Sequence, residues 1–212
     1  MSQCLKDDII RGMRYVVGID EVGRGSLAGP VMVCAAAVPP SFSFSDINGI
    51  YLRDSKQLSS HQREHLVTYF EHHSQIYFFL STLSSHTIDR ISISRAANRG
   101  ALSALHRLHN ELSDSISTIN LDGRLYLGDQ RDSHWKSLPV HTIVKGDEVI
   151  PAIAVASIYA KVMRDRFMQR LGMRYPGYGL AVHKGYGTMF HRTMIKAFGS
   201  TKIHRTTFLR NI

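Results

Sequence analysis

The chain has 212 residues, of which 43% are hydrophobic and 20% are charged. This length suits one domain, and this composition excludes a largely disordered or collagen-like protein because it supplies enough apolar side chains for a core. The two cysteines exclude a disulfide framework and favour a reducing compartment, so we expect a cytoplasmic location.

Three short apolar runs in the first third predict strands, because they are rich in β-branched or aromatic residues and are bounded by Gly, Pro and Ser. They are Tyr15–Asp20, Val31–Val38 and Ile76–Leu83, and we expect them to be neighbours in one sheet. Between the second and third runs, Ser59 or Ser60 can cap a helix over His61–Glu71.

Helices are predicted to dominate the middle of the chain. Thr87 can cap a helix that starts at Ile88, and Ala96–Leu112 carries apolar residues at helical spacing. These residues predict a stripe that faces the core: Ala97, Ala101, Leu105, Leu108 and Leu112.

The second half of the chain returns to strand and then to a long helix. Ile116–Asp122 and His141–Lys145 predict strands, and the polar stretch Gly123–Ser137 between them predicts a loop or hairpin. Pro151 suits the first turn of a helix that runs to about Leu171, and the YPGYG segment that starts at Tyr175 breaks it. The whole pattern predicts one α/β domain with a basic helical C-terminal part.

The positive charge is concentrated in the last third of the chain. Residues 1–138 hold 14 Lys and Arg against 14 Asp and Glu, whereas residues 139–212 hold 12 against 3, which is the whole net charge of +9. This asymmetry favours a polyanionic partner, and nucleic acid in particular. A solvated basic surface is the simpler alternative. We expect no membrane span, because the longest apolar run, Val31–Val38, is far shorter than the ~20 residues that a span needs. We expect no membrane binding either, because the sequence shows no amphipathic basic helix with an aromatic apolar face.

The segment Gly18–Pro30 places two adjacent carboxylates, Asp20 and Glu21, at the end of an apolar strand. In a regular strand they would point to opposite faces, so the strand must bend or end there for both to serve one site. Carboxylate oxygens are ligands that Mg²⁺ and Mn²⁺ prefer. A solvated strand end is the alternative for such a pair.

Gly23, Gly25 and Gly29 follow this strand in a spacing close to a dinucleotide-binding fingerprint, which would indicate an oxidoreductase. That fingerprint opens a helix whose N-terminus holds the pyrophosphate, whereas Pro30 is followed here by another predicted strand. Asp20 and Glu21 would also repel phosphates. We therefore reject this alternative.

Two further acids follow predicted strands. Asp122 precedes Gly123, and Asp147 follows Lys145 and Gly146 just before the Pro151 helix. If these elements are adjacent in the fold, both acids can converge on Asp20 and Glu21 to form a two-metal type of site. Taken singly, an acid in such a place is more often a turn residue than a metal ligand.

Six segments, in this order, resemble the bacterial ribonuclease HII family. They are Asp20–Gly25 (DEVGRG), Asp54–Leu58 (DSKQL), Asp122–Gly123 (DG), Lys145–Asp147 (KGD), Ala156–Asp165 (ASIYAKVMRD) and His183–Thr188 (HKGYGT). The similarity runs from about Tyr15 to Phe208. It is to RNase HII rather than RNase HIII, which carries a Gly-Lys-Gly loop and an N-terminal extension domain for which the 14 residues before Tyr15 leave no room.

The resemblance implies an RNase H-like α/β fold, with a mixed central sheet flanked by helices. Residues 1–212 would form a single domain with a catalytic core at about 15–172 and a basic substrate-binding part at about 173–212. It also implies that the catalytic residues and metal ligands are Asp20, Glu21, Asp122 and Asp147, which would bind Mg²⁺ or Mn²⁺ in a two-metal mechanism.

The implied activity is hydrolysis of the phosphodiester 5′ to a ribonucleotide, in RNA-DNA hybrids and in duplex DNA with embedded ribonucleotides, leaving 3′-hydroxyl and 5′-phosphate ends. Gly23, Arg24 and Gly25 would sense the ribonucleotide together with Tyr186. Glycines let the backbone approach the minor groove closely enough to hydrogen-bond a 2′-hydroxyl. We expect a monomer that binds these nucleic acids.

Five polar residues are predicted to contact phosphates without reading sequence: Lys56, Lys145, Ser157, Lys161 and Lys184. Asp165 lies four residues after Lys161, so we expect it to pair with that lysine rather than bind metal. His183 is expected to have an ordinary hydrogen-bonding or surface role.

The segment between Asp122 and Lys145 is longer than expected for the family. It contains Asp129 and Asp132, either of which could compete with Asp122 as the third ligand. Because it also contains Trp135 and two arginines, we expect residues 124–137 to form a surface hairpin and keep Asp122 as the ligand. The non-enzymatic alternative for the whole chain is a duplex-binding protein that uses only the basic C-terminal part.

Overall fold

The computed structural model describes residues 13–44, 46–47, 50–52, 57–128, 135, 137–210 and 212. Its main sheet has five strands in the order β5-β2-β1-β6-β7. These are β1 (Tyr15–Val22), β2 (Val31–Val38), β5 (Tyr77–Leu83), β6 (Ile116–Asp122) and β7 (Val140–Ile143). β2 pairs antiparallel with β1 and β5, whereas β6 pairs parallel with β1 and β7, so the sheet is mixed as the resemblance implied. A short second pair joins β3 (Asp46–Ile47) to β4 (Ile50–Tyr51).

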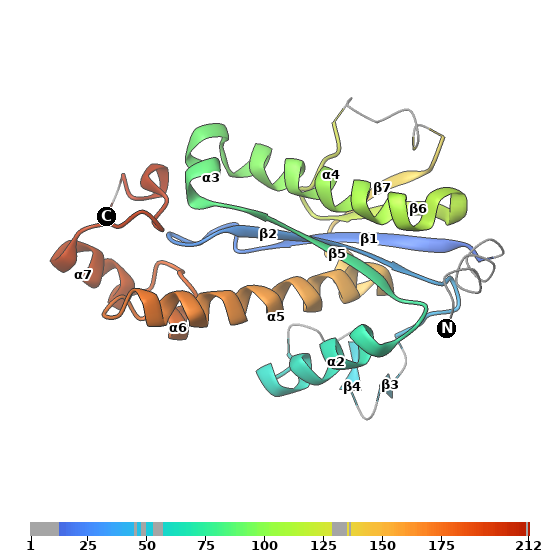
Figure 1. The fold of residues 1–212 in the computed structure, drawn as a ribbon, viewed down its shortest axis with the longest axis horizontal. Coiled ribbons are helices and arrows are strands. Elements are labelled where there is room, and N and C mark those ends of the chain that lie inside the picture. Colours follow the sequence, from blue (N-terminus) through green and yellow to red (C-terminus); the bar gives the residue numbers. More distant parts are fainter. Residues whose placement is uncertain are drawn as a thin grey trace.

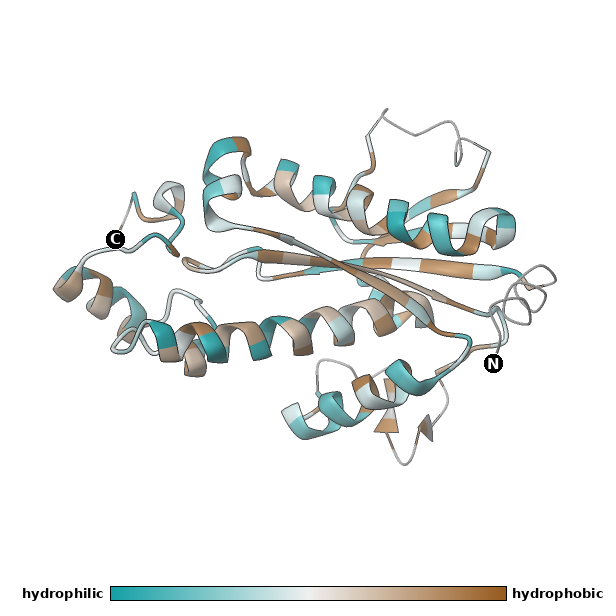
Figure 2. Ribbon diagram, viewed as in Figure 1, coloured by the Kyte–Doolittle hydropathy of each residue, from teal (hydrophilic) through white to brown (hydrophobic). Residues whose placement is uncertain are grey.

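Helices cover both faces of the sheet (Figure 1). The pair α3 (Ser85–Ile91) and α4 (Ile93–Leu112) lies over one face, and α2 (Ser60–His72) and α5 (Pro151–Arg174) lie on the other side. The predicted stripe of α4 is buried against the sheet in one core cluster, and α2 and α5 belong to a second. All residues of β2 are buried, and Figure 2 shows hydrophobic residues concentrated along the central strands.

Gly18 lets the start of α5 pack directly on β1. A Cβ at this position would lie 2.2 Å from backbone atoms of Ala152 and Ile153, so a larger residue would push the helix away. Because Gly18 precedes Asp20 by two residues, this contact also brings the first turns of α5, including Ser157, next to the predicted acids.

The C-terminal part packs on the far end of α5 and on the loop that joins β1 to β2. It contains α6 (Leu180–His183), α7 (Met189–Phe198) and the 3₁₀ turn η5 (Thr206–Phe208). Its apolar contacts form a separate core cluster: Leu27, Ala28, Met168, Tyr178, Leu180, Ile195 and Ile203. A β-bridge between Ala28 and His204 ties the loop to the last residues of the chain.

Most predicted elements are confirmed, because apolar runs and Ser or Pro at helix starts are strong local signals. Ser59 caps α2, and β2 and β6 have the predicted bounds. The predicted cap at Thr87 is wrong: Ser84 caps α3 and accepts a hydrogen bond from the Thr87 N–H. β7 ends before Lys145, which adopts a left-handed backbone conformation with φ of 56°.

The segment 124–137 differs from the predicted surface hairpin where the structure describes it. Leu125, Leu127 and Trp135 are buried in the core cluster of α4, and the Trp135 ring packs against His106 and His109. The indole is therefore a core residue, as expected of a large apolar ring with a hydrophobic face nearby. Asp129 and Asp132 lie outside the described residues. Among the described helices, none is both long and apolar enough to cross a membrane.

Candidate active site

Asp20 lies on β1 beside the carboxyl end of the parallel strand β6, since the register pairs Ile19 with Leu121. β1 continues through Glu21 and ends at Val22, and the Asp20 Oδ1 accepts a hydrogen bond of 2.7 Å from the Glu21 N–H. Burial raises the pKa of Asp20 to about 8; the Ser157 hydroxyl opposes this shift, and the charges of Asp122 and Glu21 add to it. Three carboxylates thus influence one another at the same end of the sheet.

Glu21 is less buried but is also held in an unfavourable place for an anion. Burial raises its pKa, Arg24 opposes the shift, and Asp122 adds to it. Its Oε1 accepts a hydrogen bond of 3.2 Å from Arg24 Nη1, whereas its buried Oε2 has no hydrogen-bond partner among the described residues. Buried polar atoms are normally paired, so this oxygen has an acceptor capacity that the described residues leave unused.

Asp122 ties the end of β6 to the 3₁₀ turn η4 (Gly146–Glu148). The Asp122 Oδ1 accepts a hydrogen bond of 2.6 Å from the Gly146 N–H, and the next residue, Asp147, is buried. A Cβ on Gly146 would lie 3.2 Å from that same oxygen, so a glycine allows this approach. The structure thus brings the predicted segment Lys145–Asp147 against Asp122.

The donor chemistry of these acids fits a divalent cation. In the described part of the chain, no three His, Cys, Asp or Glu side chains are arranged to hold an ion as they stand. Asp122 Oδ1 faces an amide, and Glu21 Oε1 faces a guanidinium. A cation bound here would nevertheless reduce the repulsion between the carboxylates, and it would give the unpaired Glu21 oxygen a partner.

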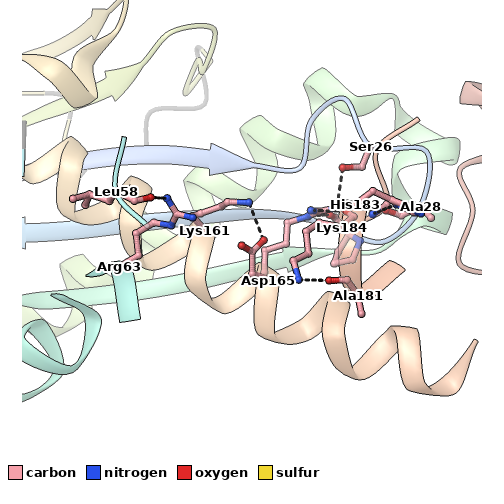
Figure 3. Close-up of polar contacts among 12 residues, drawn as sticks. Ser26, Ala28, Leu58, Arg63, Lys161, Asp165, Ala181, His183 and Lys184 are labelled. Atoms are coloured by element: carbon pink, nitrogen blue, oxygen red, sulfur yellow. Dashed lines mark hydrogen bonds and ion pairs between the residues drawn. The ribbon is translucent and has the colours of Figure 1, made fainter. Parts of the chain in front are cut away.

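A cleft of about 360 Å³ opens beside the acids and is lined by Glu21, Val22, Arg63, Ser157, Ile158, Lys161 and Tyr186. Four of these residues were predicted from the sequence. Arg63 was not: it comes from α2 and donates a hydrogen bond to the Leu58 carbonyl (Figure 3). Arg63 lies in the helix that follows the DSKQL segment, and this position could have indicated that it belongs to the site.

The loop Gly23–Arg24–Gly25 lies next to the Tyr186 segment. Gly23 has a φ of +86°, and the Leu27 N–H donates a hydrogen bond of 2.8 Å to the Gly185 carbonyl. The guanidinium of Arg164 lies 5.7 Å from the centre of the half-exposed Tyr186 ring. Thus two segments that are far apart in the sequence form one surface, and Tyr186 also borders the cleft.

The predicted phosphate contacts fall into three groups. Ser157 and Lys161 line the cleft, and Lys161 pairs with Asp165 at 2.9 Å as predicted (Figure 3). Lys145 and Lys184 are not among the cleft-lining residues; Lys145 lies 3.9 Å from Glu148, and Lys184 donates to the Ala181 carbonyl. Lys56 lies outside the described residues.

Fewer cations of residues 139–212 are exposed than the sequence alone suggests. Arg164 and Arg205 are completely buried, so two of the 12 cations are unavailable to a polyanion. His183 has the ordinary role expected: its Nε2 bonds the Tyr178 carbonyl at 2.7 Å.

Comparisons with known proteins identify the family to which the chain is similar. The Ribonuclease HII family profile matches residues 17–211. Ribonuclease HII of Parasynechococcus marenigrum is 41% identical over 208 residues, covering 98% of this chain and 88% of the relative. Ribonuclease HII of Prochlorococcus marinus is 37% identical over 195 residues, covering 92% of this chain and 96% of the relative.

A solved structure shares the fold as well. The ribonuclease H2 of Pyrococcus horikoshii OT3 superposes with a TM-score of 0.70 at 25% identity, covering 92% of this chain and 95% of that one. The β2 strand that follows Pro30 also rules out the helix that a dinucleotide-binding loop requires. The chain therefore belongs to the ribonuclease HII family of ribonuclease H enzymes.

Proposed function

We propose that this enzyme hydrolyses the phosphodiester bond 5′ to a ribonucleotide, in RNA-DNA hybrids and at ribonucleotides embedded in duplex DNA, leaving 3′-hydroxyl and 5′-phosphate ends. The observation that carries the proposal is the acid cluster at the end of β1 and β6, beside a cleft that also contains Tyr186. One edge of this cleft can bind metal, and the other can contact a base or sugar.

Asp20, Glu21, Asp122 and Asp147 are the proposed ligands of Mg²⁺ or Mn²⁺. When bound, two such ions would activate a water molecule and stabilise the leaving 3′-oxygen. The fit is supported by the hard oxygen donors, by the mutual electrostatic effect of Asp20, Glu21 and Asp122, and by the orphaned Glu21 Oε2.

The side chains around the acids position the strand. Lys161 and Arg63 would attract phosphates in the cleft, and the Ser157 hydroxyl can donate to a phosphate oxygen or to Asp20. Tyr186, a partly exposed ring at the same cleft, would stack on a sugar next to the scissile phosphate. Lys56, Lys145 and Lys184 would add phosphate contacts farther along the duplex.

The loop Gly23–Arg24–Gly25 would read the ribose. A Cβ on Gly25 would meet nothing within 4 Å, so this residue faces open space and a substrate backbone can approach it closely. We further propose that residues 1–212 act as a monomeric single domain in the cytoplasm, with residues 173–212 as the substrate-binding part. The buried free thiol of Cys34 is compatible with a reducing compartment.

The test uses an end-labelled DNA duplex with one embedded ribonucleotide, beside an all-DNA duplex of the same sequence and an RNA-DNA hybrid. With Mg²⁺ or Mn²⁺ we expect cleavage only of the two ribose-containing substrates, 5′ to the ribonucleotide, and no cleavage in EDTA. Equal cutting of all-DNA duplex would show that ribose is not sensed. A cyclic phosphate on the 3′ side would show that the 2′-hydroxyl, and not water, is the nucleophile.

A further inference from the structure

Arg205 is a buried cation that the proposed chemistry does not use. It lies between α7 and η5, is completely buried, and reaches back to the loop after β1. Its Nη2 donates a hydrogen bond of 2.7 Å to the Gly23 carbonyl, its Nη1 donates one of 2.8 Å to the Arg24 carbonyl, and its Nε donates one of 3.0 Å to the Gly29 carbonyl. One rigid guanidinium therefore fixes three carbonyl groups of one loop.

Two of these bonds set the orientation of the peptide groups predicted to read ribose. In a planar trans peptide, the C=O and the following N–H point in opposite directions. Because Arg205 holds the carbonyls of Gly23 and Arg24, the N–H groups of Arg24 and Gly25 point away from it. Within the described residues neither N–H donates a hydrogen bond to the protein, and Gly25 borders open space.

A second buried arginine holds the other half of the same loop. Arg164 donates to the Ser26 hydroxyl at 2.9 Å, to the Pro30 carbonyl at 3.1 Å and to the Lys184 carbonyl at 3.0 Å. Ser26 and Ala28 accordingly lie beside His183 and Lys184 (Figure 3). Arg164 thus joins the loop to the Tyr186 segment, but it bonds neither the Gly23 nor the Arg24 carbonyl.

Keeping two cations buried together is unfavourable unless their donors are satisfied. Burial lowers the pKa of Arg205, and the nearby Arg164 lowers it further, so the electrostatic effect of burying the two cations together is unfavourable on balance. A neutral apolar residue would fill the space without this cost. A guanidinium occupies the site because its several N–H donors can hold the loop carbonyls, and no apolar residue can do so.

We propose that Arg205 is a specificity-determining positioning residue, which orients the Arg24 and Gly25 amides toward a ribose 2′-hydroxyl. This inference rests on the proposed ribose-directed function. The amides would touch the substrate, and Arg205 would act through them. A 2′-hydroxyl can accept a hydrogen bond from a fixed amide, whereas a 2′-deoxyribose offers no acceptor at that position.

Arg205→Lys is the variant that tests this geometry. Lysine keeps the positive charge but is a single ammonium on a flexible stem, so it cannot hold both carbonyls in one plane. Arg164→Lys is the matched control, because it makes the same change at an equally buried arginine, on α5, that hydrogen-bonds the other half of the same loop. Asp89→Asn is a second control, because Asp89 accepts hydrogen bonds from Thr206 and Thr207 next to Arg205 and is not among the hydrogen-bond partners of its guanidinium.

The measurement is the ratio of dissociation constants for an all-DNA duplex and for the same duplex with one ribonucleotide, in EDTA so that no cleavage occurs. The wild-type ratio should exceed one, and Arg205→Lys should reduce it about tenfold or to one, since one neutral hydrogen bond is worth roughly that factor. Arg164→Lys and Asp89→Asn should keep the wild-type ratio of dissociation constants, even if their melting temperatures fall as far as that of Arg205→Lys.

Each outcome has a distinct meaning. If the wild type shows no preference, ribose sensing itself fails and the proposed function is wrong. A wild-type preference that survives in folded Arg205→Lys would overturn the inference, as would an equal loss in Arg164→Lys, which would indicate general loosening of the loop. If Arg205→Lys does not fold by circular dichroism, Arg205→Gln, which keeps two N–H donors, takes its place with the same expected loss.

Discussion

The acid cluster and the loop proposed to sense ribose, Gly23–Gly25, lie side by side but are stabilised in opposite ways. Asp20, Glu21 and Asp122 come from strand ends of one sheet. Asp122 raises the pKa of both Asp20 and Glu21, and Glu21 also raises that of Asp20. The loop, by contrast, is held by two buried cations from other elements, Arg164 of α5 and Arg205 before η5, whose donors are satisfied by its backbone carbonyls and a hydroxyl. The first region keeps carboxyl oxygens close together where a cation can bind, whereas the hydrogen bonds of the second region fix the shape of the loop.

This contrast separates two kinds of functional group. Groups that bind metal must keep oxygen atoms without hydrogen-bond partners. The packed core around them holds the carboxylates in place although they repel one another. Groups that discriminate between ribose and deoxyribose must be rigid, because a loose amide would adapt to either sugar. Substitutions in the first region should therefore abolish catalysis and spare the fold, whereas substitutions in the second should change selectivity or stability.

The largest expected effect follows loss of a carboxylate. Asp20→Asn, Asp122→Asn and Asp147→Asn should each reduce the single-turnover cleavage rate by at least roughly 10²- to 10³-fold, because an amide keeps the shape but removes a charged ligand atom. Substrate affinity and melting temperature should stay near wild type, and EDTA should reproduce the loss. Near wild-type cleavage by Asp122→Asn, with inactive Asp129→Asn or Asp132→Asn, would reassign the third ligand.

The next effect concerns the ring at the junction of the two regions. Tyr186→Ala should lower the cleavage rate on a single-ribonucleotide duplex by roughly 10²-fold while changing affinity much less, because a phosphate misplaced by about 1 Å reacts that much more slowly. Tyr186→Phe keeps the stacking surface and should retain most of the rate. Quench-flow rates and binding isotherms measured on the same duplex separate the two quantities. Equal losses of rate and affinity would make Tyr186 a simple binding residue.

The sequence predicted the first region better than the second. Apolar runs that end in an acid mark Asp20 and Asp122 locally, and parallel strands then bring such ends together. Burial of Arg164, Arg205 and Trp135 left no comparable local signal, because each depends on partners far away in the chain. From the sequence alone, a basic residue in a basic segment is predicted to be exposed. Only the structure reveals the carbonyl groups that surround it.

A smaller effect is expected from the cleft cations. Affinity for duplex should fall with rising salt, and Arg63→Ala should make the log-log slope shallower by about 0.9, the value for one phosphate contact on B-DNA. Lys184→Ala, at a cation outside the cleft, should also make the slope shallower. Arg107→Ala is the control, because this exposed residue lies on α4 about 20 Å along the helix from Ser94, which contacts Arg24. A slope near zero for the wild type would contradict the inference that the basic C-terminal part binds phosphates.

The smallest expected effect at neutral pH concerns a histidine pair under the Tyr186 segment. The Thr201 N–H donates to His204 Nδ1 at 3.0 Å, so the neutral His204 carries its proton on Nε2. That proton is donated to His191 Nε2 across 3.2 Å, and His191 Nδ1–H then donates to the Tyr186 carbonyl at 2.9 Å. Both rings must therefore be neutral for the chain of bonds to exist.

Acid should weaken the fold through this pair. Burial lowers the pKa of His191 to about 4, opposed by the Tyr186 carbonyl and reinforced by His183 and His204. Between that value and the unfolded pKa of about 6.5 the unfolded chain binds more protons, so stability falls as pH decreases. From pH 7 to 5 this amounts to at most about 2 kcal/mol. Urea unfolding at both pH values should show a smaller decrease for His191→Gln than for wild type, although the variant starts less stable. Equal decreases would mean that His191 titrates normally in the folded protein and that the Tyr186 segment is not held by a neutral ring.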